Sequence, residues 1–452
     1  MLERLFRLSE NDAKVKTELL AGMTTFLTMA YIIFVQPAVL TTDFAGKPTG
    51  LDKGAVLLAT CVVSALASIF MGLYARYPIA LAPGMGENFF FVSVIMALGA
   101  QGVPDPWQAA LAIVLVSGIL FLILTILRTR EAIINAISPS MRNAIAVGIG
   151  LFIAFIGLQH GKVIVSNPGS MVTLNTAGNA DHLASIAVFF FGLIVAGAFQ
   201  ARQVRGAVLW GILFAAALAA ILGRLQLPDR YIGFPRIEQH AAFHFDFKHA
   251  LTWGSLPFII IFLFMDMFDT IGTLIGVSEQ AGFIKNNKLP RANRALLVDA
   301  VGTVSGACLG TSTVTSYIES ATGVAYGGRT GLTAVTTGLL FLLALIFSPI
   351  IAVIAGYAPI TAPALFVVGA LMMSNVRKID WDDFSESIPA FLTIVGIPLC
   401  YSIADGLALG FITQPIVKLM SGRGREVGWL MYVLAVVLFA YLLLVRAKLL
   451  FS

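Results

Sequence analysis

Residues 256–278 read LPFIIIFLFMDMFDTIGTLIGVS, an apolar run that is long enough to cross a bilayer and yet carries Asp266 and Asp269. An ionised carboxylate near the membrane centre costs roughly 2.5–3.5 kcal/mol on insertion scales, so such acids face protein, a water-filled cavity or a ligand. A spacing of three residues places both acids on one face of a helix. We therefore predict a functional site on this face, against the alternative that one aspartate only anchors a neighbouring helix.

The composition of the chain is that of a membrane protein. Of its 452 residues, 58% are hydrophobic and only 12% are charged, whereas soluble proteins carry about 25% charged residues. The basic residues behind the net charge of +5 fall in short loops, where they set membrane topology, so we expect no nucleic-acid partner. The first residues lack the apolar region of a signal peptide. The sequence thus predicts a multi-pass protein of the cell membrane, embedded in the lipid bilayer, with a cytoplasmic N-terminus.

The cysteines give no sign of a disulfide framework or a metal site. Cys61, Cys308 and Cys400 are odd in number, far apart in the sequence and each inside an apolar segment. We therefore expect neither a bound metal nor a cofactor.

The apolar runs of roughly 17–25 residues predict an all-α fold with seven membrane spans in each half of the chain. Because an odd number of spans starts the second half on the opposite face, the two halves are expected to be inverted repeats. A further apolar run at residues 429–445 is expected to cross the membrane as an extra helix or to lie at its surface. The predicted spans are residues 20–41, 54–75, 78–99, 106–127, 140–159, 183–201, 206–223, 255–278, 293–309, 311–327, 330–352, 360–376, 387–403 and 405–420.

The basic residues agree with this division, since they recur in the loops that it places on one side of the membrane. We assign that side to the cytoplasm. Its loops contain Arg4, Arg7, Lys14, Lys16, Arg76, Arg128, Arg130, Arg202, Arg205, Lys285, Lys288, Arg291, Arg294, Arg329, Arg377, Lys378, Arg423 and Arg425.

The third and tenth spans are interrupted at corresponding places in the two halves. Residues 77–96 (YPIALAPGMGENFFFVSVIM) and 310–328 (GTSTVTSYIESATGVAYGG) each begin as a short extended run, break at glycine, proline or hydroxyl-rich positions, and restart as a half-helix. Non-helical backbone is tolerated at membrane depth only where it is buried in protein or lines a cavity. Paired broken spans therefore indicate the binding site of a transporter.

The restarts of the two half-helices carry polar residues. Glu87 and Asn88 open the first, and Glu319 opens the second. Unsatisfied N–H groups at a helix start suit acceptor atoms or a nearby carboxylate. For Glu319 there is a structural alternative, because residues 316–319 (SYIE) match a capping box, in which the glutamate only satisfies a backbone N–H.

Together these side chains predict a substrate site that can also take up a proton. Asp266, Asp269, Glu87 and Glu319 would accept N–H donors, and closely spaced buried carboxylates do not all ionise together. Aromatic side chains nearby could form a flat stacking surface, with ordinary packing as the alternative. These are Phe89, Phe90, Phe91 and Tyr317.

Several motifs resemble the nucleobase/cation symporter family, in particular its AzgA-like hypoxanthine/guanine permease branch. The similarity covers nearly the whole chain. It is carried by AGMTTFLTMAYIIFVQP (21–37), ARYPIALAPGMGEN (75–88), FMDMFDTIGTL (264–274), NKLPRANRALLVDA (287–300), GTSTVTSYIESATGV (310–324) and TAPALFVVGALM (361–372).

The resemblance implies proton-coupled uptake of purine bases by two inverted seven-helix repeats. It implies a core domain from residues 20–127 and 255–352 and a gate domain from residues 140–223 and 360–420. The resemblance also assigns Asn88, Asp266 and Glu319 to the substrate site and Asp269 to a second acid needed for transport. One departure is that Gly86-Glu87-Asn88 stands where the family usually has Gly-Leu-Asn.

The chemistry of an acid-rich site favours hypoxanthine and guanine. A carboxylate can accept the N1–H and N2–H of guanine or the N1–H of hypoxanthine, whereas adenine offers an acceptor at N1. The alternatives are an adenine permease of the same fold and, less favoured, an anion exchanger or channel on a similar inverted repeat. An intramembrane aspartyl protease would need its two aspartates facing each other across a cleft, so we expect no enzyme. The sequence leaves the oligomeric state open, with a homodimer as one option.

Overall fold

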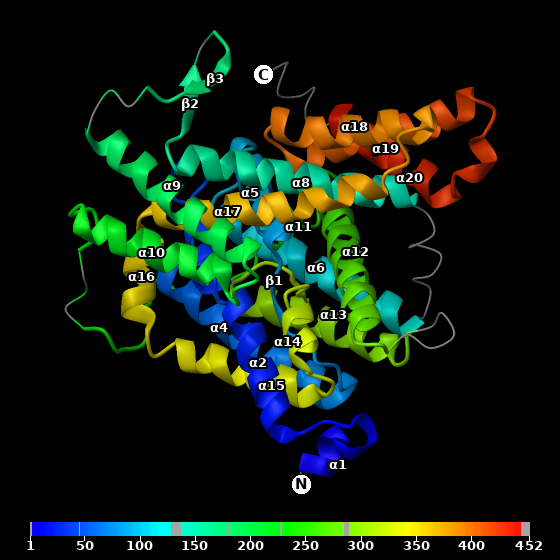
Figure 1. Ribbon diagram of the computed structural model, residues 1–452. Coiled ribbons are helices and arrows are strands. Elements are labelled where there is room, and N and C mark those ends of the chain that lie inside the picture. The colour runs from blue at the N-terminus through cyan, green and yellow to red at the C-terminus, as the bar shows by residue number, and fades with distance from the viewer. Residues whose placement is uncertain are drawn as a thin grey trace.

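The computed structural model describes residues 2–44, 46–127, 137–167, 169–176, 178, 180–226, 228, 230–283 and 289–443. Helices make up most of these ranges, and a very short strand, β1 (Leu81–Pro83), lies in the middle of the bundle (Figure 1), where it pairs with β4 (Val314–Ser316). Within the described residues, eight helices are long and apolar enough to cross a membrane. The predicted class, an all-α polytopic membrane protein, is confirmed.

Every predicted span corresponds to one or two elements of the structure. In the first half these are α2 (Val15–Met29), α3 (Ile32–Leu40), α4 (Lys53–Phe70), β1 (Leu81–Pro83), α5 (Met85–Ala100), α6 (Pro106–Leu127), α8 (Pro139–His160), α9 (Ala180–Ala201) and α10 (Ala207–Ile221). In the second half they are α12 (Leu256–Gln280), α13 (Ala292–Leu309), β4 (Val314–Ser316), α14 (Ser320–Tyr326), α15 (Gly331–Ala344), α16 (Ser348–Gly356), α17 (Ala358–Met372), α18 (Phe384–Leu399) and α19 (Ile403–Met420).

Two predicted spans are divided in the structure. The span at 20–41 consists of α2 and α3, and the hydroxyls of Thr24 and Thr28 bond to carbonyls of the preceding turn of α2. Such back-bonding weakens and bends helices. The span at 330–352 was predicted as one helix and is wrong in its C-terminal part, because α15 ends at Ala344 and α16 restarts at Ser348. Pro349 explains the restart, since proline is accommodated at the first helical positions.

The predicted C-terminal helix is present as α20 (Trp429–Tyr441). The last two residues of the predicted range 429–445 lie outside the described residues, as do Arg128, Arg130, Lys285 and Lys288. The structure also contains an antiparallel hairpin between α8 and α9 that was not predicted, formed by β2 (Ile164–Asn167) and β3 (Met171–Leu174).

The predicted breaks in the third and tenth spans are confirmed. β1 precedes the half-helix α5, and β4 precedes the half-helix α14. The two strands pair antiparallel, with Leu81 opposite Ser316 and Pro83 opposite Val314. This pairing satisfies backbone groups that would otherwise be unpaired at membrane depth, and it brings the starts of both half-helices together.

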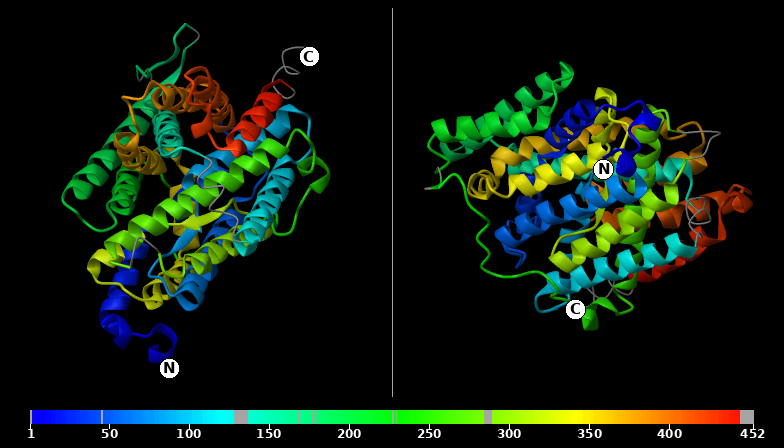
Figure 2. Two further views of the ribbon diagram at one scale, coloured as in Figure 1. Left: turned by 90° about the vertical axis from the view of Figure 1, so that its right-hand side faces the viewer. Right: turned by 90° about the horizontal axis from the view of Figure 1, so that it is seen from below.

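The helices pack in two groups. In one, α15 contacts α2 and α4, and α13 contacts α4 and α6. In the other, α8 contacts α17 and α18, while α9 contacts α10 and α17. The second group occupies the upper part and one edge of the molecule, where α9 and α10 lie side by side (Figure 2). These groups fall in the predicted core and gate ranges, but their roles as core and gate domains stay a prediction.

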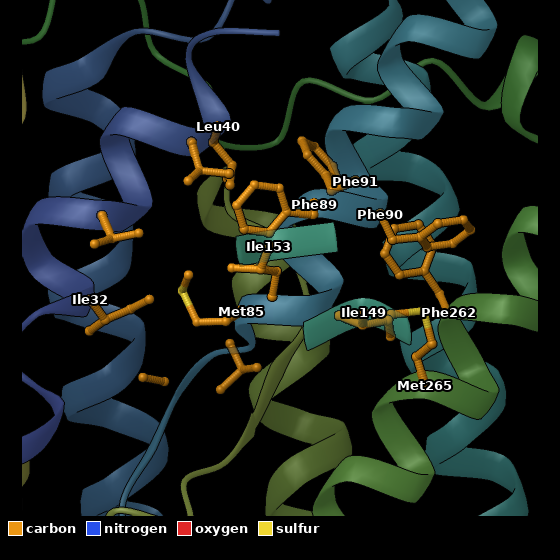
Figure 3. Packing of buried hydrophobic residues seen from close by; sticks show 14 of the residues in the cluster. Ile32, Leu40, Met85, Phe89, Phe90, Phe91, Ile149, Ile153, Phe262 and Met265 are labelled. Atoms are coloured by element: carbon orange, nitrogen blue, oxygen red, sulfur yellow. The ribbon is translucent and has the colours of Figure 1, made fainter. Parts of the chain in front are cut away.

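Glycines allow the closest helix contacts within each group. A side chain at Gly331 would collide with the backbone of Gly72, and one at Gly369 would collide with the backbone of Gly150. Small residues let membrane helices approach closely. Between the two groups, apolar side chains of α5 face α8: Met85 and Phe89 lie beside Ile149 and Ile153 (Figure 3).

Candidate functional site

The two aspartates of α12 have different surroundings. The Asp266 side chain is buried, with 1% of its surface exposed, whereas Asp269 is exposed. The exposed face continues along α12, since Ile275 is 47% exposed and a side chain at Gly272 would meet no other atom. The helix therefore holds Asp266 in the protein interior and Asp269 on its exposed face.

Asp266 meets a second buried aspartate, Asp299 on α13. The two carboxyl groups are close enough for their charges to interact. Thr303 donates to Asp266 Oδ2 at 2.7 Å, and Thr270 donates to Asp299 Oδ1 at 2.7 Å. The remaining oxygens, Asp266 Oδ1 and Asp299 Oδ2, are buried and have no other donor among the described residues. These are the oxygens that an acid–acid hydrogen bond would join.

A hydrogen bond between two carboxyl groups requires a proton between them, because ionised carboxylates only accept. Like charges at that distance do not both ionise, as the paired acids of aspartic proteases illustrate. Within the described ranges, no lysine, arginine or histidine forms an ion pair with Asp266 or Asp299. The buried pair is therefore a site that is suited to sharing one proton.

Glu319 lies at the start of α14 and is half-buried. Its Oε1 accepts a hydrogen bond from the Tyr31 hydroxyl at 2.9 Å. The capping-box interpretation is wrong: Ser316 ends β4, α14 begins only at Ser320, and the Glu319 side chain makes no capping bond. The Tyr317 N–H donates to the Ala80 carbonyl, so the chain is still extended after Ser316, the residue at which the capping box would begin. Glu319 is thus available for other partners.

Glu87 is buried in the first turn of α5, with 2% of its surface exposed. Its carboxylate folds back over Gly84, where any side chain would collide with it. The charge of Glu87 is close enough to Asp266 and Asp269 to interact with both. The structure therefore brings Glu87, Asp266, Asp269 and Glu319 to the crossing of the two broken spans.

Asn88 is completely buried and bonds to a glutamine from α3. Its Oδ1 accepts from Gln36 Nε2 at 2.9 Å and from the Ser312 hydroxyl, and its Nδ2 donates to Gln36 Oε1. Gln36 Nε2 also donates to Thr311 Oγ1 at 2.9 Å. Asn88 thus links the first, third and tenth spans through a network of amides and hydroxyls.

All four predicted aromatic side chains, Phe89, Phe90, Phe91 and Tyr317, are buried. Phe89 lies between Phe44 and Phe152, with ring centroids 6.2 and 6.3 Å away. Tyr317 donates its hydroxyl hydrogen to the Pro83 carbonyl at 2.5 Å, which ties the tenth span to the third. Stacking of either ring on a substrate stays a prediction.

The structure adds three residues that the sequence reasoning did not single out: Tyr31, Gln36 and Asp299. Asp299 stands in an apolar helix, ANRALLVDAVGTVSGACL, so the rule that drew attention to Asp266 would also have found it. Tyr31 and Gln36 carry no such signal, because their role depends on the bend between α2 and α3.

Comparisons with known proteins agree with this architecture. The sequence profile of the xanthine/uracil permease family matches residues 16–409. The guanine/hypoxanthine permease PbuG of Bacillus subtilis is 44% identical, over 98% of this chain and 100% of that protein. The adenine permease AdeP of Escherichia coli is 42% identical, over 94% of this chain and 92% of its own length.

The fold also resembles a solved transporter structure. The transmembrane domain of the cyanobacterial bicarbonate transporter BicA matches with a TM-score of 0.64 at 13% sequence identity, covering 87% of this chain and 97% of that one. An identity this low supports the inverted-repeat fold alone. The profile match and the relatives place the whole chain among permeases rather than enzymes. This multi-pass membrane protein belongs to the xanthine/uracil permease family.

Proposed function

We propose that this permease imports purine nucleobases, hypoxanthine and guanine in preference, by proton symport with alternating access. The observation that carries the proposal is the buried pair Asp266–Asp299, in which each carboxyl group has one oxygen without a hydrogen-bond partner among the described residues, beside the accessible Asp269. The relatives include a guanine/hypoxanthine permease and an adenine permease, which supports a purine substrate.

In this proposal the base binds between the starts of α5 and α14. Glu319 is the acid that a base can reach from the exposed face of α12, and it accepts the N1–H of hypoxanthine or the N1–H and N2–H of guanine. Glu87 and Asn88 take part from the opposite half-helix, and Phe89 and Tyr317 form the aromatic walls. Asp266 contacts the base when the two helix groups close around it.

The proton follows a short route through α12. Asp269 is exposed and lies one turn from Asp266, so it exchanges protons with the surroundings and passes them to the Asp266–Asp299 pair. Glu319 completes the proton-coupling set, because its charge lies close to that of Asp269. Binding of the base and protonation then favour the same conformational change, which is the linkage that symport requires.

Alternating access would arise from movement of one helix group against the other. The apolar contact between α5 and α8 offers a surface for such sliding, because it contains no ion pair among the described residues (Figure 3). The proposal places the protein in the cell membrane with its N-terminus in the cytoplasm, according to the positions of the basic loops.

Uptake of labelled hypoxanthine in a purine-permease-deficient strain tests the proposal. Unlabelled guanine and hypoxanthine should compete strongly and adenine weakly, and a protonophore should abolish accumulation. Accumulation that survives the protonophore would overturn proton symport. Strong competition by adenine alone would instead favour an adenine permease, which the similarity to AdeP makes the second candidate.

A further inference from the structure

A second polar cavity lies away from the two broken spans, where α8 and α18 begin and α19 ends. Its volume is about 270 Å³, close to the lower end of the roughly 300–1,000 Å³ found for small-molecule sites. Arg142, Glu386, Gln414 and Lys418 line it. The basic loops place this end of the helices in the cytoplasm in the proposed topology.

Arg142, which lines the cavity, also contacts the helix that carries the proposed transport site. The guanidinium carbon of Arg142 lies 5.8 Å from the centre of the Phe268 ring, and Phe268 directly precedes Asp269 on α12. Arg142 therefore connects the cavity lining to the segment of α12 that carries Asp269.

The charges around the cavity balance. Glu386 accepts hydrogen bonds from Ser138 at 2.5 Å and Gln414 at 3.1 Å, and it forms an ion pair with Lys418 at 3.0 Å. Lys418 also pairs with Glu426 at 2.9 Å. With Arg142 the lining holds two cations and two carboxylates, so it suits an uncharged ligand with donors and acceptors better than an anion.

Arg142 is the charged group of this lining that remains open to a ligand. Within the described part of the chain, no carboxylate lies within ion-pair distance of it, and its Nε is buried without a hydrogen-bond partner. Arginine pairs in bidentate fashion with adjacent O6 and N7 acceptors of a purine. An amino group at C6, as in adenine, would oppose this arrangement donor to donor.

We propose that the cavity is a second binding site for 6-oxopurines, occupied by the base on its way into the cytoplasm. Arg142 donates hydrogen bonds to O6 and N7 of the base, Glu386 accepts hydrogen bonds from its N–H groups, and the Gln414 amide supplies a further hydrogen-bonding group. The inference rests on the proposed function, because it takes the same bases as the transported substrate.

Equilibrium binding of labelled hypoxanthine to the purified full-length protein tests this site. The wild type should bind two bases per chain. Asp266→Asn should retain one, the cytoplasmic site, and the double variant Asp266→Asn with Arg142→Gln should bind at least about tenfold more weakly. In the Asp266→Asn background, adenine should compete at least about tenfold more weakly than guanine.

Arg224→Gln is the matched control, since it removes a guanidinium that pairs with Asp181 far along the gate helices and should leave both sites intact. If the wild type binds only one base per chain, the inference is overturned, and this result does not depend on the folding of any variant. The inference is also overturned if Asp266→Asn loses all binding while its melting temperature equals that of the wild type. Absence of any binding to the wild type would instead refute the proposed function itself.

Discussion

The centre of the molecule and the joined ends of α18 and α19 both gather carboxylates, but they neutralise them differently. At the helix ends, Asp383, Glu386 and Glu426 surround Lys418 at 3.6, 3.0 and 2.9 Å, and Arg423 binds Asp383 at 2.7 Å. In the centre, the acids accept hydrogen bonds from hydroxyl groups, and no cation forms an ion pair with them among the described residues.

The ionisation of the acids follows this difference. The hydrogen bond from Ser385, reinforced by Arg423 and Lys418, holds the pKa of Asp383 well below its usual range. Hydrogen bonds from Arg423 and Lys418 lower the pKa of Glu426 to about 2. These acids stay ionised and fasten the structure. The comparison teaches that acids paired with cations keep a fixed charge, whereas uncompensated acids are the ones able to carry protons.

The largest expected effect is at the buried pair. Asp266→Asn and Asp299→Asn should each reduce hypoxanthine accumulation to background, because an amide cannot exchange the shared proton. Accumulation should be measured per amount of folded protein in the membrane. Asp52→Asn is the control, since Asp52 only caps α4. Normal hypoxanthine accumulation by both Asp266→Asn and Asp299→Asn would contradict the claim that the central acids, unlike those at the ends of α18 and α19, carry protons.

Glu319→Gln should weaken guanine binding by about ten- to a hundredfold, because hydrogen bonds to a charged group contribute roughly 1.5–3 kcal/mol. The variant should stay folded, since the glutamine oxygen can still accept from Tyr31. Competition of guanine against labelled hypoxanthine measures the change. Tyr31→Phe, which keeps the carboxylate, should have a smaller effect, and equal guanine affinity in Glu319→Gln and the wild type would exclude Glu319 from the site.

Glu87 allows a finer comparison, because its carboxylate interacts with the central acids and stands where the resemblance expects leucine. Glu87→Gln should shift the pH profile of uptake without abolishing it. Glu87→Leu should change the relative competition by guanine, hypoxanthine and adenine. If both variants keep the wild-type pH profile and base preference, Glu87 has only a local structural role.

The smallest effect is expected at the paired acids. Asp383→Asn should leave uptake per folded protein unchanged and lower the melting temperature by at most about 4 °C. A carboxylate with a lowered folded pKa stabilises the protein above its unfolded pKa, roughly 3.9 for aspartate, and this contribution is lost as the pH falls toward the folded value. The difference from the wild type should therefore shrink below about pH 4. A difference that persists there would exclude ionisation as its cause.

Much of the fold could be predicted because the bilayer constrains the sequence strongly. Apolar runs marked the spans, and Pro83-Gly84 and the hydroxyl-rich run before Glu319 marked the two breaks that β1 and β4 now explain. The division between α15 and α16 was missed, because residues 330–352 contain no charged residue and only Pro349 signals the division.

The site was predictable where a charge stood alone in an apolar run, as at Asp266. The partners of these acids were not, since hydrogen bonds such as Tyr31 to Glu319 join residues hundreds of positions apart. The capping-box interpretation failed for a related reason. The pairing of β4 with β1 keeps residues 314–316 extended, and a short sequence motif contains no information about a strand that is distant in the sequence.

The account is tested most directly by following protons and base together in proteoliposomes that contain the purified permease and an internal pH dye. Addition of hypoxanthine should acidify the lumen in step with its uptake for the wild type, and neither signal should appear with Asp266→Asn or Asp299→Asn. Uptake of hypoxanthine by the wild type without any acidification would contradict the claim that the buried acid pair couples proton and base transport.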